Sequence, residues 1–325
     1  MPNNWKTYNI GDVATLQRGF DLPNSKRKNG AFPVIAASGF ISWHNVFKVK
    51  GPGVTTGRSG SLGQVFYVEK DFWPLNTSLW VKDFHNNEPR FIYYFLKTIN
   101  FEEFNSGTSV PTLNRNDVHS LEVNIPDLPE QKAIASILAA IDDKIENNLA
   151  INKTLEDMAM ALYKHWFVDF GPFQDGEFID SELGPIPKGW EVKRLEKFCS
   201  LTMGQSPKSE FYNSNQTGLP FHQGVKDYGN RFPEDITYST QGNRYAENGD
   251  VLFSVRAPVG RLNIAKNKII LGRGLAGIRM NENNYNGFLF YSLKNRFTED
   301  DLIGGGTVYK SVNKTDLLDL KFIVP

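Results

Sequence analysis

The feature that most constrains this chain is an internal repeat, in which blocks from the first part of the sequence return in the same order in the last part. The phrase "WKTYNIGDVATLQRG" (5–19) aligns with "WEVKRLEKFCSLTMG" (190–204) through the leading Trp, two apolar positions and the closing Gly. Later blocks follow at offsets that change little, pairing 32–39 with 219–224, 53–68 with 250–265, 91–97 with 288–294 and 107–121 with 306–320. Self-similarity of this kind predicts two copies of one domain, each of roughly 130 residues.

Each copy is predicted to mix strands with helices. The Trp-led segments should run from a short strand or turn into a strand, and β-rich runs bounded by Gly and charged residues predict further strands at 63–68 and 251–255. Aromatic residues at helical spacing predict helices at 88–104 and 286–297. The copies close on "LEVNIP" and "LKFIVP", which we interpret as strands ended by Pro, the second following a short helical turn capped by Asn313.

Between the copies lies the most regular stretch of the chain, where apolar positions alternate at steps of three and four. This pattern predicts one long helix over 127–170 with a heptad seam. Pro129 suits a first turn, and Asp127 is favourable at the positive end of the helix. The nine seam positions assigned to a helix interface are Leu138, Ile141, Ile145, Asn148, Asn152, Leu155, Ala159, Leu162 and Trp166. The two Asn residues would set the register of a coiled coil, and the alternative is one edge of an ordinary core helix.

The predicted fold class is therefore α+β, or mixed, with two repeated α/β domains joined by a long coiled-coil-type helix. The predicted segments are a first domain (1–126), the spacer helix (127–170), a Gly- and Pro-rich linker (171–189) and a second domain (190–325).

Charge divides the chain in the same way, although the formal net charge is zero. Residues 1–125 carry 13 Lys and Arg against 10 Asp and Glu, residues 126–186 carry 4 against 12, and residues 187–325 carry 19 against 14. This division fits two lobes that face a polyanion and a middle that faces protein. Cys199, the single cysteine, excludes an internal disulfide and suits a cytoplasmic location, and it shares no metal-ligand spacing with the five His. No apolar run is long enough to span a bilayer and the N-terminus lacks the pattern of a secretory signal, so no membrane contact is expected.

Two phrases carry a resemblance to a known family. The helix phrase, which begins "IPDLPEQ" (125–131) and ends "HWFVDF" (165–170), strongly resembles the central conserved helix of specificity subunits of type I restriction–modification systems. "GPIPKGWEVKRLEKF" (184–198) resembles the phrase that opens the second target-recognition domain of those subunits. With the repeat, the resemblance covers nearly the whole chain. It implies a DNA sequence-specificity subunit in which each domain reads one half of a bipartite site and the helix fixes the gap.

The resemblance also implies partners rather than catalysis in this chain. Double-stranded DNA, modification subunits that methylate adenine with S-adenosylmethionine, and a restriction subunit that uses ATP and Mg would complete the complex, with no cofactor or metal bound here. The residues agree, because the glycine-rich stretch 51–63 has Pro52 and Arg58 where a Walker motif needs Gly and Lys. The tetrapeptide expected of an adenine methyltransferase is also missing, so a self-sufficient enzyme is disfavoured.

DNA reading needs cations and amides in loops, where they can reach base edges and phosphates. Arg58 and Arg256 lie in matching Gly-rich blocks of the two copies, and a solvated surface charge is the alternative for each. The candidates in the first domain are Lys26, Arg27, Lys28, Thr56, Arg58, Ser59, Ser61 and Thr108. Those in the second domain are Gln223, Lys226, Tyr228, Arg231, Arg256, Arg261, Thr307, Tyr309 and Lys310.

The end of the chain sets a further expectation. Full-length members of this family carry a second conserved helix, whereas here Pro325 aligns with Pro126 and no such helix follows. Because each Leu or Ile left exposed forgoes about 1.5–3 kcal/mol of burial, we expect the seam to pair with another copy of the chain, a separate fragment or modification-subunit helices. The alternative function is a truncated scaffold or assembly subunit without independent DNA specificity, which a shallow salt dependence of DNA affinity would indicate.

Overall fold

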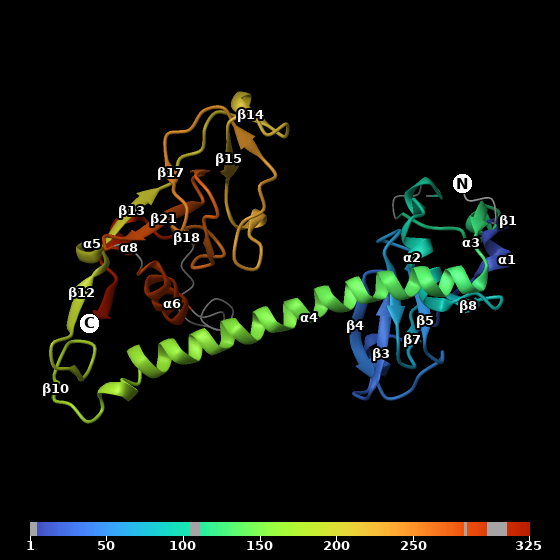
Figure 1. Cartoon of the computed structure of the whole chain (residues 1–325), viewed down its shortest axis with the longest axis horizontal. Coiled ribbons are helices and arrows are strands. Elements are labelled where there is room, and N and C mark those ends of the chain that lie inside the picture. The colour runs from blue at the N-terminus through green and yellow to red at the C-terminus, as the bar shows by residue number, and fades with distance from the viewer. Residues whose placement is uncertain (1–4, 105–110, 283–284, 298–310) are drawn as a thin grey trace. The chain divides into compact units, whose positions relative to one another are not determined.

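The computed structural model describes residues 5–104, 111–282, 285–297 and 311–325. The chain divides into two compact units, Met1–Ile151 and Asn152–Pro325, so that the division falls within the long helix α4 (Leu128–Phe167). Figure 1 shows both units and labels many of their elements.

The first unit is built on an antiparallel sheet of four strands in the order β2-β8-β5-β6. A second sheet, β4-β3-β7, contains a parallel pair, and β1 pairs antiparallel with β9. The strands are β1 (Lys6–Asn9), β2 (Thr15–Arg18), β3 (Phe32–Ala36), β4 (Gly39–His44), β5 (Gly53–Gly57), β6 (Val65–Val68), β7 (Trp73–Pro74), β8 (Ser78–Asp83) and β9 (Glu122–Ile125). The helices before α4 are α1 (Ile10–Val13), α2 (Pro89–Lys97) and α3 (Arg115–His119), with 3-10 turns at Asn24–Lys26 and Phe101–Phe104.

The second unit repeats this topology in its four-stranded sheet, but its second sheet has five strands, in the order β14-β16-β15-β20-β17, where the first unit has three. Its four-stranded sheet has the order β13-β21-β18-β19, β12 pairs with β22 as β1 pairs with β9, and β15 and β20 form the parallel pair. The strands are β10 (Phe178–Ile179), β11 (Ile186–Pro187), β12 (Glu191–Arg194), β13 (Cys199–Met203), β14 (Tyr212–Asn213), β15 (Leu219–His222), β16 (Tyr238–Ser239), β17 (Tyr245–Ala246), β18 (Val251–Ser254), β19 (Leu262–Ile264), β20 (Ile269–Leu271), β21 (Leu275–Met280) and β22 (Lys321–Val324). The helices are α5 (Leu195–Phe198), α6 (Asn286–Arg296) and α8 (Lys314–Leu318), with 3-10 turns at Gly171–Phe173, Ser209–Phe211 and Val225–Asp227. The predicted duplication and mixed fold class are confirmed.

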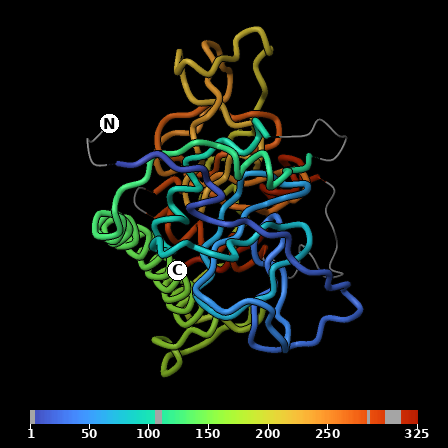
Figure 2. The backbone as a smooth tube through the Cα atoms, turned by 90° about the vertical axis from the view of Figure 1, so that its right-hand side faces the viewer, coloured from blue at the N-terminus to red at the C-terminus, as the bar shows by residue number. Residues whose placement is uncertain are grey.

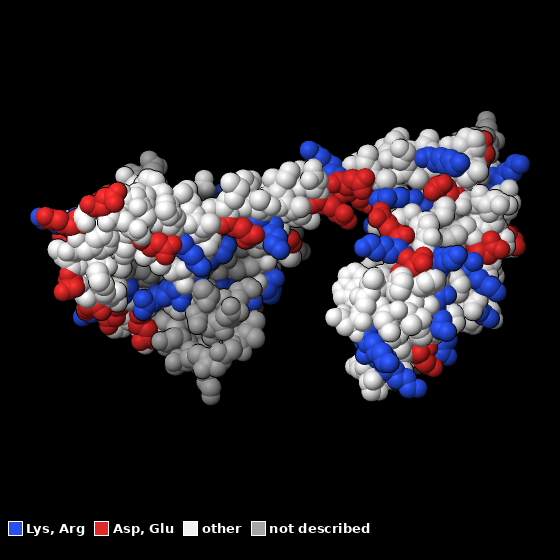
Figure 3. Space-filling model, turned by 90° about the horizontal axis from the view of Figure 1, so that it is seen from below, with Lys and Arg blue, Asp and Glu red and all other residues white. Residues whose placement is uncertain are grey.

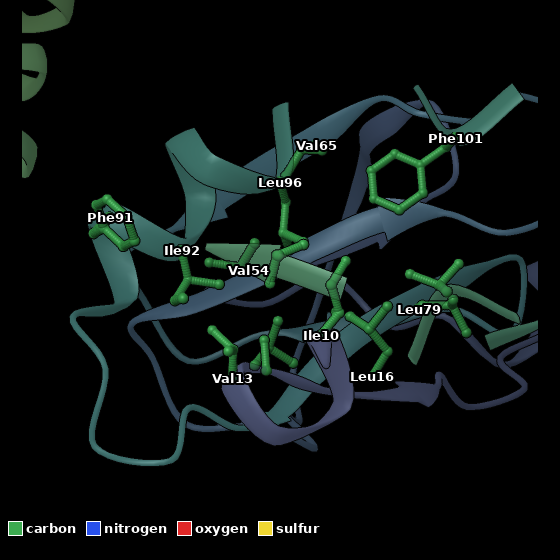
Figure 4. Close-up of a cluster of buried hydrophobic side chains, with 14 of the residues drawn as sticks. Ile10, Val13, Leu16, Val54, Val65, Leu79, Phe91, Ile92, Leu96 and Phe101 are labelled. Carbon is green, nitrogen blue, oxygen red and sulfur yellow. The ribbon is translucent and has the colours of Figure 1, made fainter. Parts of the chain in front are cut away.

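A helix packed on the four-stranded sheet forms the main core of each unit. In the first unit, buried side chains from α1, β2, β5, β8 and α2 meet in one cluster, shown in Figure 4. Pro89 occupies the first turn of α2, and Phe91, Ile92 and Leu96 turn one face of that helix into the cluster. In the second unit α6 buries Leu289 and its neighbours against the equivalent sheet. Both aromatic runs thus form helices, because their apolar faces cover the sheets, but the first helix ends at Lys97 and residues 101–104, predicted to continue it, form a separate 3-10 turn.

Short local signals explain the ends of the repeats. Asn313 caps α8 with a reciprocal capping box, since its Oδ1 accepts from Asp316 N at 3.0 Å and its own N donates to Asp316 Oδ2 at 2.9 Å. The expected closing strands are present as β9 and β22. The Trp-led segments differ from expectation, because each inserts a four-residue helix, α1 or α5, between its two strands. A single turn is too short to produce a periodic pattern.

The N-terminal part of α4 is anchored to the first unit by its opening residues. Asp127 Oδ1 accepts from Glu130 N at 3.0 Å and so caps the helix. Gln131 is 2% exposed and makes three hydrogen bonds there. Its Oε1 accepts from Glu88 N at 3.0 Å, and its Nε2 donates to Asn87 Oδ1 at 2.7 Å and to Pro126 O at 2.9 Å. Asp127 and Gln131, which belong to the segment that resembles the known family, therefore fix the start of α4 on the first unit.

Residues 171–189, which we predicted as a linker, are folded within the second unit. Strands β10 and β11 pair antiparallel, and Phe170, Ile186 and Trp190 form a buried aromatic and aliphatic cluster with Phe167 of α4 packed against it. The Gly and Pro content indicated turns correctly, but it concealed this small core.

Candidate nucleic-acid interface

Charge alone does not mark a contact surface. On the face shown in Figure 3, Lys and Arg side chains are spread among Asp and Glu over the described surface of the first unit. The described residues contain no group of three or more His, Cys, Asp or Glu side chains placed to hold a metal ion. In the same part of the chain, no helix has both the length and the apolar content that a membrane span requires. A DNA-contacting surface must therefore be identified from the exposure and the contacts of individual residues.

The first group of predicted contacts lies in the loop between β2 and β3, which Figure 2 shows in dark blue extending from the body of the first unit. Lys26 and Lys28 are exposed, as a DNA contact requires. Arg27 is half-buried, and its Nε and Nη2 both lie 3.4 Å from Leu22 O. The buried His44 accepts from the backbone N of Lys28 through Nδ1 at 3.1 Å. The contacts of Arg27 and His44 thus fix the loop, while the exposed side chains of Lys26 and Lys28 can reach an anion.

The second group follows β5, in the Gly-rich turn. Gly57 is required here, because a Cβ at this position would lie 1.7 Å from Ser61 O. The turn brings Arg58, Ser59 and Ser61 to partly exposed positions, and Ser59 pairs with Thr112 in an isolated bridge. Thr56 is not accessible to DNA, because the residue is only 1% exposed. Its Oγ1 has no hydrogen-bond partner among the described residues. Three of the four residues chosen from this block are therefore accessible.

The third group surrounds β15 in the second unit, where the segment carrying β14 and β16 projects from the rest of the unit (Figures 1 and 2). Lys226 is exposed, and Gln223 accepts from Ser206 Oγ at 2.8 Å through Oε1. Tyr228 is the opposite case, because its OH is buried without a hydrogen-bond partner among the described residues, and burial raises its pKa. Its hydroxyl therefore cannot donate to DNA without a rearrangement.

Arg231 belongs to an ion-pair network with the long helix. Its Nη1 pairs with Glu156 Oε1, and Lys294 Nζ lies 3.2 Å from Glu156 Oε2. Tyr291 also donates to that carboxylate, at 3.2 Å. Partial burial works against ionisation of Glu156, but the charges of Arg231 and Lys294 outweigh it and hold the pKa of Glu156 below its ordinary value. The charge of Arg231 is thus committed to fixing α4 on α6.

Arg256 and Arg261 flank the turn between β18 and β19. Arg256 is exposed and pairs with Ser311 in an isolated bridge, and Arg261 is half-buried beside Lys294 in a hollow of about 560 Å³. The bridge from Arg256 to Ser311 corresponds to the bridge from Ser59 to Thr112, so Arg256 is the counterpart of Ser59 rather than of Arg58. The remaining predicted contacts lie outside the described residues: Thr108, Thr307, Tyr309 and Lys310.

Two residues near Arg58 were missed by sequence reasoning. Arg18 at the end of β2 and Arg115 at the start of α3 line the same hollow as Arg58. They stand 40 or more residues from Arg58 in the chain, so no local motif could have joined them.

The helix-interface positions lie along an exposed face of α4. Ile141 and Ile145 are each 52% exposed, Leu155 is 56% exposed and Leu162 is 59% exposed. Trp166 and both Asn residues of the seam are also exposed, whereas Leu138 and Ala159 are half-buried. Within the described chain this face is therefore left open, and what covers it stays a prediction.

Comparison with known proteins identifies the family. Residues 2–157 and 187–325 match the family model for the Type I restriction modification DNA specificity domain. A protein of Methanocaldococcus jannaschii named as the MjaX type I restriction enzyme specificity subunit is 37% identical over 73% of this chain and 58% of its own length. The MjaIX specificity subunit of the same organism is 30% identical over 68% of this chain and 57% of its own. The chain thus spans less than two thirds of the length of these curated relatives.

A solved structure supports the fold. The crystal structure of the type I restriction-modification system S subunit from M. genitalium aligns with a TM-score of 0.63 at 18% identity, over 99% of this chain and 85% of that one. This likeness extends across both copies of the repeat. The chain belongs to the family of type I restriction modification DNA specificity domain proteins.

Proposed function

We propose that this chain is the DNA sequence-specificity subunit of a type I restriction–modification complex, with each repeated domain reading one half of a bipartite site. The observation that carries the proposal is that the two units share a strand arrangement but differ in their loop residues. The four-stranded sheet, the pairing of the first strand with the last and the Asn-capped turn recur in both units, while the partly exposed loop residues differ between them. A shared frame with different loops is what two readers of different half-sites require.

The chain would select DNA and leave the chemistry to its partners. Modification subunits would methylate adenine with S-adenosylmethionine, and a restriction subunit would use ATP and Mg to cleave DNA, all in the cytoplasm. The family membership supports this division of labour, together with the lack of Walker and adenine-methyltransferase motifs in the sequence.

Helix α4 would provide the protein-facing surface. Its open apolar face lies in the part of the sequence with an excess of acidic residues, which disfavours contact with DNA and suits a protein. We therefore assign the seam from Leu138 to Trp166 to helices of a partner protein, with modification subunits as the first expectation.

The test is co-expression of this chain with its modification subunit in a host that lacks adenine methylation, followed by methylation sequencing. The expected result is one bipartite adenine motif that disappears when this chain is omitted. Methylation of the same motif without the chain, or no motif with it, would contradict the proposal and favour a scaffold role.

A further inference from the structure

We propose that the hollow lined by Arg18, Arg58 and Arg115 binds a phosphate of the DNA backbone, and that the first unit alone makes this contact. The inference rests on the proposed DNA-reading function and adds to it a named anion site. The hollow measures about 380 Å³ and lies between the end of β2, the turn after β5 and the start of α3. Leu79 and residues 112–114 complete its lining.

Among the described residues, no carboxylate lines the hollow to balance the three guanidinium groups. Several arginines elsewhere in the described chain form ion pairs, as Arg90 does with Asp143 at 3.3 Å and Arg194 with Asp319 at 3.1 Å. By contrast, no described residue forms an ion pair with Arg18, Arg58 or Arg115, and the lining includes neither Asp nor Glu among the described residues. Among the described residues, the side chain of Arg58 makes one long hydrogen bond, from Nη1 to Asn76 O at 3.5 Å. Like charges gathered around one hollow without a counterion are unfavourable until an anion enters.

A phosphate diester fits this site better than a base edge does. It carries a formal negative charge, and its oxygens accept the paired N–H groups of a guanidinium. A base edge offers acceptors but no net charge, so it would leave the three cations unbalanced. Burial and then the charge of Arg18 lower the pKa of Arg58, which agrees with a guanidinium held in a cationic setting.

The backbone around Arg58 is fixed before any ligand arrives. Arg58 N donates to Thr77 O at 2.9 Å, and Arg58 O accepts from Leu113 N at 2.8 Å. Gly60 N also donates to Pro111 O, at 3.1 Å. These bonds connect the β5 turn to the segment that leads into α3, so the elements that carry Arg58 and Arg115 are joined directly. A backbone that is fixed in advance loses little freedom on binding, which favours a specific contact over a diffuse one.

The second unit has the same frame without the same charges. Val312 N donates to Val255 O at 3.0 Å, which makes Val255 the counterpart of Arg58. By register in the sheet, Met203 stands where Arg18 stands, because it pairs with Ala276 as Arg18 pairs with Leu79. After the matching caps, Lys314 takes the place of Arg115. One cation replaces three, so the frame does not need the arginines in order to fold. This difference is the argument for a binding role.

The test measures affinity for a random-sequence DNA duplex as a function of salt, using the full chain. In Arg18→Ala with Arg58→Ala, the slope of log affinity against log salt should fall by about one for each phosphate that the protein no longer neutralises. Binding should weaken by the same factor on duplexes of any sequence. If Arg58→Ala disturbs folding, Arg18→Ala with Arg115→Ala removes two exposed cations from the same hollow and should give the same fall.

Two controls make the result specific. Lys82→Ala removes one exposed cation from β8 outside the hollow, and Lys314→Ala removes the counterpart cation of the second unit, so neither should change the slope. An equal fall in Lys82→Ala would overturn the proposal in favour of a general charge effect. Weakening confined to duplexes carrying the methylated motif would overturn it in favour of base reading. The proposed function fails separately, through loss of the bipartite methylation motif in the wild-type chain.

Discussion

Lys294 on α6 places its Nζ 3.2 Å from Oε2 of Glu156 on α4, and this ion pair joins the C-terminal part of the long helix to the body of the second unit. The spacer is therefore fixed by charge as well as by apolar packing of Tyr163 and Phe167 against Phe288. These contacts hold the C-terminal part of α4 against α6 of the second unit.

Replacing this carboxylate should weaken the second unit measurably. Glu156→Gln keeps the shape but removes the charge that Arg231 and Lys294 share, and we expect a loss of about 1 kcal/mol in the free energy of unfolding, because the pairs are partly solvated. Urea unfolding at neutral pH is the measurement. Glu146→Gln, an exposed position on the same helix, is the matched control and should change stability by less than about 0.5 kcal/mol.

The same carboxylate should make stability depend on pH in the acidic range. The pKa of Glu156 is lowered in the folded chain from its ordinary 4.5, so its contribution is complete above that value and is lost as pH falls through the folded pKa. The unfolding free energies of wild type and Glu156→Gln should therefore differ at neutral pH and converge as the pH falls below 4.5 and through the folded pKa of Glu156. A difference that stays constant on acidification would show that ionisation of Glu156 contributes nothing.

Among the residues at the start of α4, Gln131 is predicted to be the one whose substitution lowers the free energy of unfolding most. Gln131→Ala would leave the backbone N of Glu88 without its partner in a buried site and open a small cavity, at a cost of about 2–3 kcal/mol. Thermal or urea unfolding of the full chain would show it. The neighbouring exposed Lys132 offers the comparison, since Lys132→Ala should be nearly neutral.

The exposed face of α4 should matter for assembly rather than for folding. Ile141→Lys with Ile145→Lys places two charges on an open face, so the chain should keep its unfolding free energy but no longer bind the modification subunit. Size-exclusion chromatography with light scattering would report the complex. Asn147→Lys, on a different face of the same turn, should still assemble, and normal assembly of the double variant would exclude the seam as the interface.

The helices, the capped turn and the repeat could be predicted from the sequence, because each depends on a local or periodic pattern of residues. The aromatic spacing of α2 and α6, the cap at Asn313 and the seam of α4 are all periodic or local. The candidate site was harder, because a polar residue in a loop does not reveal which way it points. Thr56 and Tyr228 were chosen by residue type, but Thr56 and the hydroxyl of Tyr228 are buried, and Arg231 is held by a helix residue 75 positions away. Arg18 and Arg115 could not be linked to Arg58 from the sequence, because only the folded structure places the three residues around one hollow.

The central claim, that each repeat reads one half-site independently, is tested most directly by replacing residues 1–126 with a second copy of residues 190–325. The graft is geometrically reasonable, because β12 and β22 pair as β1 and β9 do, and the copy ends at Pro325 where the first repeat ends at Pro126. Methylation sequencing should then yield a bipartite motif whose two halves are both the half-site of the original second repeat. A motif whose first half is unchanged would contradict the account.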